Sequence, residues 1–464
     1  MSDVARYLMI DFGSTFTKLV AVDREREDIL ATAMRPTTVT TDIRTGYRAA
    51  LADLEERLGG PVAFDRIVAC SSAAGGLKMA AIGLVEELTV EAAKRVCLGA
   101  GAKVDLVLSH HVTKAEVKKI LDKKIDIVLL AGGADGGNTE CALYNLKMLG
   151  EAGLRIPIVY AGNKDCQDDV LALFETYGLE GHVAENVMPR INQLNVKSAR
   201  DAIRDIFLKR IIEAKGIKKI EDEIDEVVLP TPEAVLTACE LLSKGYMNEP
   251  GMGELCVVDI GGATTDMYSV CHATKRSDVI LRGLEEPYAK RTVEGDLGVR
   301  WSAPGIVQSL SEEELKMVLL DTGVDLKAEA EKRFADVSFL PLTPEDEYAD
   351  RLLAEMCAYK AMSRHAGRME EVFTPIGMAY NQTGKDLTDV RTVIGTGGPI
   401  IRSRFAREIL AKTSAVFRGT QELRPARPDF YLDSEYILAA MGLFARIDPL
   451  SALRIMKKHM KPLQ

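Results

Sequence analysis

The sequence predicts an α/β protein that has two lobes and an inserted βαβ subdomain. Two β-hairpins with aspartate, glycine and hydroxyl residues at their tips lie far apart, one near the start of the chain and one past its middle. Between them, short apolar strands alternate with helical segments, a pattern typical of βαβ units on a parallel sheet. The chain has 464 residues, which is too long for one ordinary hydrophobic core. At least two domains are therefore expected.

The later hairpin, residues 255–270, has a tip that suits a phosphate. Two β-rich runs flank a glycine pair, and a turn without bulky side chains leaves its backbone N–H groups open to a phosphate. Threonine hydroxyls can donate to phosphate oxygens, and an aspartate at the strand end can hold a hydrated Mg²⁺, which prefers carboxylate and water. The candidate residues are Asp259, Gly261, Gly262, Thr264 and Thr265. Glycine pairs also close many hairpins that bind nothing, so this motif alone leaves both interpretations open.

The earlier hairpin, residues 8–22, repeats this design. An apolar strand leads into an aspartate, a glycine and hydroxyl residues, and a second apolar strand follows. The candidate residues are Asp11, Gly13, Ser14, Thr15 and Lys18. Lys18 adds a cation that can reach a phosphate, although it can equally be a solvated lysine at a strand edge. Two such hairpins in one chain suggest two lobes that face one polyphosphate.

A Gly-rich turn near residue 396 forms the third motif. The run 391–394 is expected to be a buried strand, and 402–412 is expected to be helical. The glycines between them are Gly395, Gly397 and Gly398. Such a turn lets the backbone lie flat against a base or a ribose, although taken alone it can be any β–α turn.

In this order, the three motifs resemble the two phosphate loops and the adenosine loop of the actin, sugar kinase and heat-shock chaperone ATPase superfamily. Residues 230–242 and 434–443 resemble its two interlobe helices. The resemblance implies a two-lobed actin-like ATPase of duplicated ribonuclease H-like domains that binds ATP and Mg²⁺. It implies catalytic roles for Asp11 and Asp259, which would hold Mg²⁺ through water. Many relatives carry Glu at the position of Leu229, so fast hydrolysis is not expected here.

The motifs divide the chain into five parts. The expected parts are a first lobe with the first phosphate hairpin (1–83), an inserted α/β subdomain with a helical connector (84–228), the first interlobe helix (229–252), a second lobe with the second phosphate and adenosine loops (253–430), and a return interlobe helix with the tail (431–464).

The inserted subdomain carries two distinctive loops, residues 131–138 and 161–165. Both follow predicted parallel strands, and α/β folds place ligands at the carboxyl ends of such strands. Asn138 or Thr139 can cap the helix that follows. The glycines can also simply make tight βα turns, and both interpretations stay open for the first loop. In the second lobe, residues 294–298 resemble the acidic glycine loop with which such ATPases close over a nucleotide or contact a client.

Composition excludes several classes of function. The formal net charge of −10 argues against binding to nucleic acid or to an anionic membrane. We find no signal peptide and no apolar stretch long enough to span a bilayer, so a cytoplasmic location is expected. The eight cysteines are scattered without a CxxC pair, which favours reduced core thiols over a disulfide framework, a zinc ribbon or an iron–sulfur site.

At whole-chain level, the sequence resembles the accessory proteins of glutamate (methylaspartate) mutase, an adenosylcobalamin-dependent enzyme. The stretches that carry this resemblance are 10–18, 129–140, 160–164 and 259–266. The resemblance implies an ATP-driven helper that frees damaged cobalamin from a mutase or otherwise keeps the mutase active. The implied partners are therefore mutase subunits.

Other functions stay open at this level, because one fold serves many activities. A small-molecule kinase would need a catalytic aspartate, for which Asp266 and Asp296 are candidates. A reductase activator would need a cysteine-ligated cluster, and the cysteine spacing speaks against one. A non-enzymatic, nucleotide-gated scaffold is a further alternative, and a homo-oligomer is compatible with each of these functions.

Overall fold

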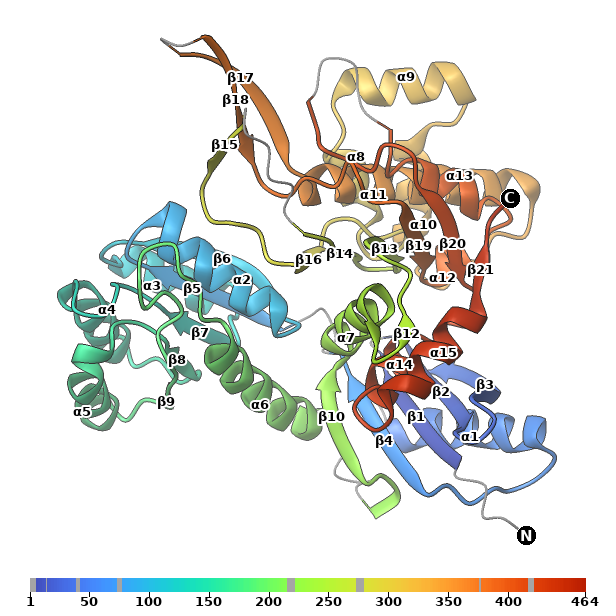
Figure 1. Ribbon diagram of the computed structural model, residues 1–464, viewed down its shortest axis with the longest axis horizontal. Coiled ribbons are helices and arrows are strands. Elements are labelled where there is room, and N and C mark those ends of the chain that lie inside the picture. Colours follow the sequence, from blue (N-terminus) through green and yellow to red (C-terminus); the bar gives the residue numbers. More distant parts are fainter. Residues whose placement is uncertain are drawn as a thin grey trace. The chain divides into compact units, whose positions relative to one another are not determined.

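The computed structural model describes residues 6–13, 15–38, 42–72, 77–214, 222–272, 279–374, 377–415 and 421–464 (Figure 1). The chain folds into two compact units. The first comprises Met1–Val22 and Leu30–Glu233, and the second comprises Asp23–Ile29 and Ala234–Gln464. The finer five-part division expected from the sequence stays a prediction.

The first unit begins with a five-stranded sheet in the order β10-β4-β1-β2-β3. Its strands are β1 (Arg6–Phe12), β2 (Phe16–Asp23), β3 (Asp28–Pro36), β4 (Arg66–Ser71) and β10 (Glu226–Pro230). β4 lies parallel to β1, and β10 lies parallel to β4. Helix α1 (Ile43–Leu58) is capped by Asp42 and ends at Gly59 with a positive φ, which is the usual way to start and stop a helix.

The second unit repeats this strand order. Its sheet runs β16-β14-β13-β19-β20-β21, with β13 (Leu255–Ile260), β14 (Thr265–Val270), β16 (Ala289–Glu294), β19 (Thr392–Thr396), β20 (Asp429–Asp433) and β21 (Met460–Pro462). β14 is antiparallel to β13 and β16, whereas β19 and β20 continue the sheet in parallel. In both units, a meander of three strands is extended by two parallel strands. The predicted duplicated ribonuclease H-like α/β fold is therefore confirmed.

Helices cover the second sheet and bury a continuous apolar core. They are α8 (Ala303–Gln308), α10 (Leu326–Ala335), α11 (Pro344–His365), α12 (Gly398–Ile401) and α13 (Ala406–Ala411). The longest, α11, begins at the Thr343 cap with a proline and three acidic residues in its first turn, and it ends with Arg364 and His365. The acids at the start and Arg364 at the end complement the helix dipole, so this sequence favours both ends of the helix.

The first unit also contains the expected inserted subdomain. Its five strands are all parallel, in the order β6-β5-β7-β8-β9: β5 (Lys78–Gly83), β6 (Lys103–Ser109), β7 (Ile127–Leu130), β8 (Ile158–Tyr160) and β9 (Gly181–Val183). Helices α2 (Glu91–Gly99), α3 (Lys114–Asp122), α4 (Glu140–Glu151), α5 (Gln167–Tyr177) and α6 (Lys197–Ala214) alternate with them. The sheet begins with β5, before the predicted start at residue 84.

An early and a late segment of the chain lie together in the second unit. Its segment Asp23–Ile29, the turn between β2 and β3, lies against α15 (Pro449–His459). Asp28 pairs with Lys458 and His459, and Glu27 accepts from Arg454. The remaining helices of this region are α7 (Thr231–Lys244), the predicted first interlobe helix, and α14 (Leu438–Phe444), which lies in the predicted return helix.

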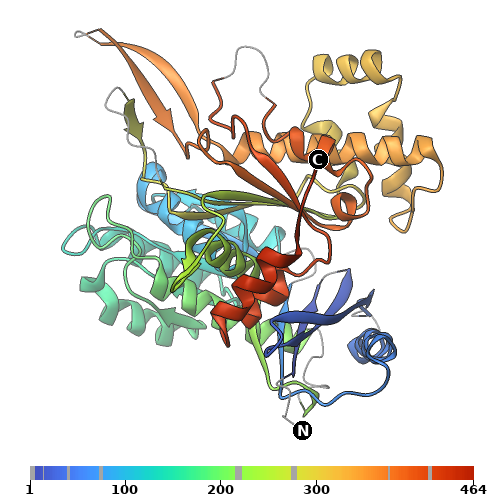
Figure 2. The ribbon, with the colours of Figure 1, turned by 45° about the vertical axis from the view of Figure 1, so that its right-hand side comes forward.

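Three smaller elements extend the second unit (Figures 1 and 2). A two-stranded ladder joins β11 (Gly245–Tyr246) to β12 (Glu249–Pro250). A three-stranded arm consists of β15 (Val279–Arg282), β17 (Arg368–Thr374) and β18 (Gly377–Thr383). Helix α9 (Glu312–Thr322) lies at the outer edge of this unit. Within the described ranges, we find no helix with the length and apolarity that a bilayer crossing requires.

Candidate functional site

The first hairpin makes a turn that leaves no room for a side chain at Gly13. The Gly13 N–H donates to the Phe16 carbonyl at 3.1 Å, and a Cβ on Gly13 would lie 2.6 Å from that oxygen. Thr15 is exposed beside the turn, and its carbonyl accepts from the Thr37 N–H at 2.8 Å. Ser14, the other predicted hydroxyl residue, lies outside the described residues. A tight turn of this kind presents backbone and a small hydroxyl to a ligand, as the sequence predicts.

Asp11 is the most strongly fixed residue of this hairpin. Its side chain is only 4% exposed, and three groups contact its two oxygens. Lys18 Nζ lies 3.1 Å from Oδ2, while the Thr231 hydroxyl donates to Oδ1 at 2.6 Å and the Cys70 thiol at 3.6 Å. Lys18 stabilises the buried negative charge of Asp11, because burying an unpaired carboxylate costs free energy. Lys18 is therefore paired with the candidate carboxylate and is not an ordinary solvated lysine.

Sequence reasoning missed Thr231 and Cys70 as members of this site. Both follow from the topology: Cys70 lies opposite Asp11 in the register of β4 with β1, and Thr231 directly follows β10. Burial and then the charge of Asp11 raise the pKa of the Cys70 thiol well above its ordinary value, so this cysteine stays a neutral donor. Thr231 lies two positions after the buried Leu229 and supplies a hydroxyl to Asp11.

The second hairpin closes with the same hydrogen bond as the first. The Gly261 N–H donates to the Thr264 carbonyl at 2.8 Å, just as Gly13 donates to the third residue after it. A following segment supports this turn from behind: Val299 N donates to the Gly261 carbonyl at 3.2 Å, and Arg300 N donates to the Gly262 carbonyl at 2.9 Å. Both predicted glycines are thus built into a fixed turn.

The two threonines of this hairpin differ. Thr265 is fully buried, and its hydroxyl donates to the Leu297 carbonyl at 2.7 Å. Thr264 is half-buried, and its hydroxyl lies 3.5 Å from Asp266 Oδ2. A phosphate contact from the Thr265 hydroxyl would require breaking a buried hydrogen bond, so Thr264 is the better placed of the two predicted donors.

The third motif, the turn at Gly397, lies against Asp259. Thr396, at the end of β19, lies opposite Asp259 in the parallel register with β13. Gly397 follows with φ of 90°, and a Cβ there would lie 2.2 Å from the Ile260 carbonyl and 2.6 Å from Asp259 Oδ1. Only glycine fits this approach. The structure therefore brings the predicted adenosine loop against the predicted metal-binding carboxylate.

The other two glycines of this motif have different surroundings. A Cβ on Gly395 would press on Ile400 and Leu410 at 2.9 Å, so this glycine serves the packing of α12 and α13 on β19. Gly398 opens α12 and faces open space, because a Cβ at this position would meet no atom within 4 Å. Of the two, only Gly398 offers an open surface on which a ligand can lie.

Comparison with known proteins now identifies the family. The family described as MutL protein matches residues 7–460. The chain belongs to the MutL family. It is 50% identical over 456 residues to Protein MutL of Clostridium tetanomorphum, which covers 98% of this chain and 99% of that protein. The membership predicted from the sequence, in the accessory family of glutamate mutase, is confirmed.

Solved structures resemble this MutL family member only distantly. Nucleotide-free acetone carboxylase is 12% identical with a TM-score of 0.40, over 95% of this chain and 70% of that one. Gluconate kinase from Lactobacillus acidophilus is 10% identical with a TM-score of 0.36, over 100% and 93%. Glycerol dehydratase reactivase is 10% identical with a TM-score of 0.34, over 95% and 100%. The fold assignment therefore rests on the strand order described above.

Acidic residues around the second hairpin of this MutL family member are paired with arginines. Asp266 accepts from Arg291 Nε at 2.8 Å. Arg364 donates to Glu294 at 2.6 Å and to both oxygens of Asp296 at 2.7 and 2.8 Å. Burial raises the pKa of Glu294, although its hydrogen bond with Arg364 acts in the opposite direction. The predicted acidic loop 294–298 is thus held at its base by Arg364.

The two loops of the inserted subdomain bond mainly to each other. Asp135 Oδ1 accepts from Lys164 N at 3.1 Å and from Asn186 Nδ2 at 2.8 Å. Asp165 Oδ2 accepts from Gly136 N at 2.8 Å. Asn138 accepts from Cys141 N at 3.0 Å, which confirms the predicted helix cap. These contacts favour the interpretation in which the glycines make tight βα turns.

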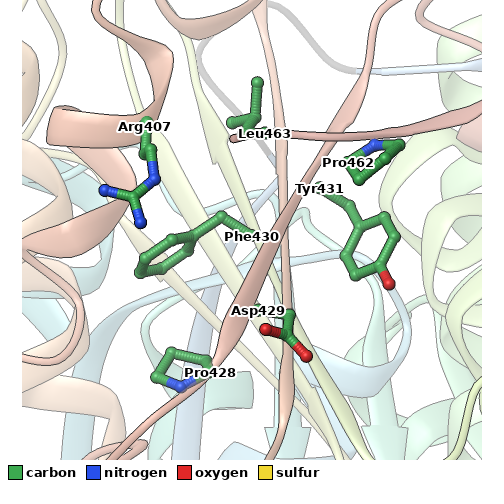
Figure 3. Close-up of a pocket in the computed structure, with 7 residues that line it drawn as sticks. All are labelled: Arg407, Pro428, Asp429, Phe430, Tyr431, Pro462 and Leu463. Atoms are coloured by element: carbon green, nitrogen blue, oxygen red, sulfur yellow. The ribbon is translucent and has the colours of Figure 1, made fainter.

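A shallow cavity of about 220 Å³ lies elsewhere in the second unit (Figure 3). Its lining residues are Arg407, Pro428, Asp429, Phe430, Tyr431, Pro462 and Leu463. Figure 3 shows Arg407 beside Phe430, while Tyr431 points to the other side of β20. The cavity lies at the start of β20, whereas the Gly397 loop lies at the other end of this strand, where Thr396 donates to Asp433 at 3.0 Å. The cavity is therefore separate from the candidate site.

Proposed function

We propose that this MutL family member is an ATP-binding, slowly ATP-hydrolysing accessory protein that keeps an adenosylcobalamin-dependent mutase active. Family membership supports an accessory role toward a mutase. One structural observation supports the nucleotide: Asp11 and Asp259 occupy the same position in two copies of one sheet. Each is the second-last residue of the first strand, and each precedes a glycine whose N–H donates to the carbonyl three residues later.

In this proposal, each unit supplies one phosphate loop. Gly13, Thr15 and Lys18 would contact phosphates from the first unit, and the turn at Gly261 would contact them from the second. The open face of Gly398 suits the base or the ribose of the nucleotide. Because the two loops belong to different units, a γ-phosphate that both of them bind favours a closed arrangement, and its loss favours opening. Opening would act on the bound mutase.

The residues fit a Mg²⁺ ion held through water. In the described part of the chain, no three His, Cys, Asp or Glu side chains converge on one point, so the ion would take most of its ligands from phosphates and water, as Mg²⁺ usually does. Asp11 already accepts bonds from Lys18 and Thr231, which suits an indirect contact. When bound, Mg²⁺ would neutralise the phosphate charge.

Hydrolysis would be slow because Leu229 stands where many relatives carry glutamate. Attack of water on the γ-phosphorus breaks the bond to the β-phosphate oxygen, and a general base normally takes the water proton. Leu229 is buried and cannot do so. Asp266 and Asp296, the candidates for a kinase base, are both bound to arginine, and we therefore do not favour the kinase alternative.

The test combines nucleotide binding with cofactor exchange. The purified chain is mixed with a glutamate-mutase-type holoenzyme that carries inactivated cobalamin, and both ATP hydrolysis and cobalamin release are followed. We expect the mutase to stimulate hydrolysis and ATP to accelerate cobalamin release. ATP binding without either effect would overturn the accessory mechanism and favour a nucleotide-gated scaffold, whereas the absence of ATP binding would overturn the whole proposal.

A further inference from the structure

Helix α9 is apolar on several sides, yet none of its residues is buried. Apolar residues occupy five of its 11 positions: Leu315, Met317, Val318, Leu319 and Leu320. Leu315 and Val318 pack in part against the core of the second unit. The others are exposed, and Leu320 is 71% exposed. A helix that is apolar on most sides is normally covered by other parts of a protein.

The ends of α9 show that it is a fixed element. Ser311 and Glu314 form a reciprocal capping box at its start. Gly323 ends the helix with φ of 72°, and its N–H donates to the Leu319 carbonyl at 2.8 Å. A short helix with satisfied ends presents its side chains in a constant arrangement. The exposed leucines are therefore displayed on a well-formed surface.

Further exposed apolar residues follow α9 in the chain. One lies on α10, and two lie in the segment between α10 and α11. Together with those of α9, they are Met317, Leu319, Leu320, Phe334, Leu340 and Leu342. We call this set the α9–α10 surface. Figure 1 shows α9 at the outer edge of the second unit, and α10 contacts α9. Large exposed apolar patches often mark interaction sites.

Acidic residues predominate in the segment that carries the α9–α10 surface, and several of them are paired with a base: Glu314 with Lys360, Asp346 with Lys332, Glu347 with Arg404 and Asp350 with Arg300. Exposed acids on or beside α9 and α10 are Glu312, Glu313, Asp321 and Glu331. Residues 311–350 contain 12 Asp or Glu and only four Lys or Arg, in a chain whose net charge is −10. Like charges repel, so this surface disfavours nucleic acid, an anionic membrane and a second copy of this acidic chain. It suits a protein with an apolar groove and a rim of lysine and arginine.

We propose that the α9–α10 surface is the site at which the mutase docks, through an apolar groove with a basic rim. This proposal rests on the function proposed above and names the surface that the partner uses. Leu320 is the central apolar contact, and acidic residues such as Glu313 and Asp321 guide the approach of the basic partner.

The test measures the binding of the full chain to the mutase holoenzyme. Leu320→Glu places a charge in the apolar contact, and we expect it to weaken binding by about tenfold or more. Leu121→Glu makes the same change at a leucine that is 52% exposed on α3 of the other unit, and we expect it to alter binding by less than about twofold. The double variant Glu313→Lys/Asp321→Lys should slow association and make it less sensitive to salt.

Each outcome separates this proposal from the proposed function. If Leu320→Glu binds the mutase as tightly as the unmodified chain does, the docking surface is overturned and the accessory function stands. If the unmodified chain does not bind the mutase, both proposals fail. Self-association of the unmodified chain that Leu320→Glu abolishes would show a second copy on this surface, and binding to vesicles of anionic lipid would show a membrane; either result overturns the proposed partner. ATP-induced melting shifts confirm that every variant is folded.

Discussion

The two Asp-Gly hairpins, β1–β2 and β13–β14, make the same turn but hold their aspartates in different ways. In the first unit, Asp11 is buried and closed off by Lys18 and Thr231. In the second, Asp259 is half-buried and lies against the backbone of the Gly397 loop. The turn itself is the same, with a glycine N–H that donates to the carbonyl three residues later. The two units thus share the turn, while the neighbouring segments supply different contacts to the two aspartates.

In the proposed nucleotide site, this difference would give the aspartates of the two hairpins different roles. A carboxylate fixed by a cation and a hydroxyl can orient water around a metal ion without moving. A carboxylate beside a Gly-rich loop couples any movement of that loop to the metal position. In the proposed nucleotide site, the first aspartate would therefore serve mainly as a rigid element, and the second would link the proposed phosphate loop to the proposed adenosine loop. Four predictions test this comparison.

The largest effect is expected at Gly397. Gly397→Ala forces a Cβ to within 2.2 Å of the Ile260 carbonyl at a φ of 90°, so the β13–β19 edge must distort. We expect a loss of about 3 kcal/mol in the free energy of unfolding, measured by chemical denaturation. Gly398→Ala is the matched control, because its Cβ would meet nothing within 4 Å. Equal stability of the two variants would contradict the tight contact.

Alanine substitution of each of the two aspartates should lower the stability of the protein by different amounts. Asp11→Ala removes a carboxylate that pairs with Lys18, which is 16% exposed, and it removes the acceptor that lies 2.6 Å from the Thr231 hydroxyl. We expect this variant to lose about 2 kcal/mol of stability without nucleotide, and Asp259→Ala to lose less. Both variants should lose the rise in melting temperature on adding ATP and Mg²⁺. A normal ATP-induced shift in Asp11→Ala would overturn the nucleotide site.

The stability of the second unit should depend on pH through His365. His365 is buried between Ser269 and Thr292, and burial, with the nearby charges of Lys290 and Lys385, holds its pKa well below 6.5. The unfolded chain takes up this proton near pH 6.5, whereas the folded chain does not. Stability should therefore fall as the pH drops below about 6.5, by about 1.4 kcal/mol per pH unit from this group. Denaturation of His365→Gln should show a correspondingly smaller slope.

The smallest effect is expected at Thr231. Thr231→Val keeps the shape of the side chain but removes the hydroxyl that donates to Asp11. We expect a loss of about 1 kcal/mol in stability and a weaker ATP-induced melting shift. Thr231→Ser restores the donor and should recover most of both. If Thr231→Val and Thr231→Ser behave alike, the hydroxyl does not orient Asp11.

Much of the fold was predictable because its signals are local. Aspartate and glycine between apolar runs predicted both hairpins, and strand–helix alternation predicted the inserted sheet. The early start of that sheet was missed because β5 is a short run, Lys78–Gly83, that includes two alanines. Alanine has little preference for strands, and here the neighbouring strands β6 and β7 decide the conformation.

The candidate site was predictable only in part, because contacts between distant segments leave no local signal. The residues at the hairpin tips follow from the sequence. The contact of Thr231 with Asp11 spans 220 residues and depends on the order of β10, β4 and β1. The burial of Thr265 likewise depends on Leu297, which lies outside the hairpin. Spacing alone cannot distinguish the half-buried Thr264 from the buried Thr265.

The meeting of Asp28 with Lys458 and His459 has a consequence for synthesis. These partners lie about 430 residues apart, and a ribosome releases the chain from its first residue to its last. The turn between β2 and β3 therefore emerges long before its partner helix α15. A product truncated before α15 cannot make this contact, so the β2–β3 turn reaches its final contacts only after α15 has been synthesised.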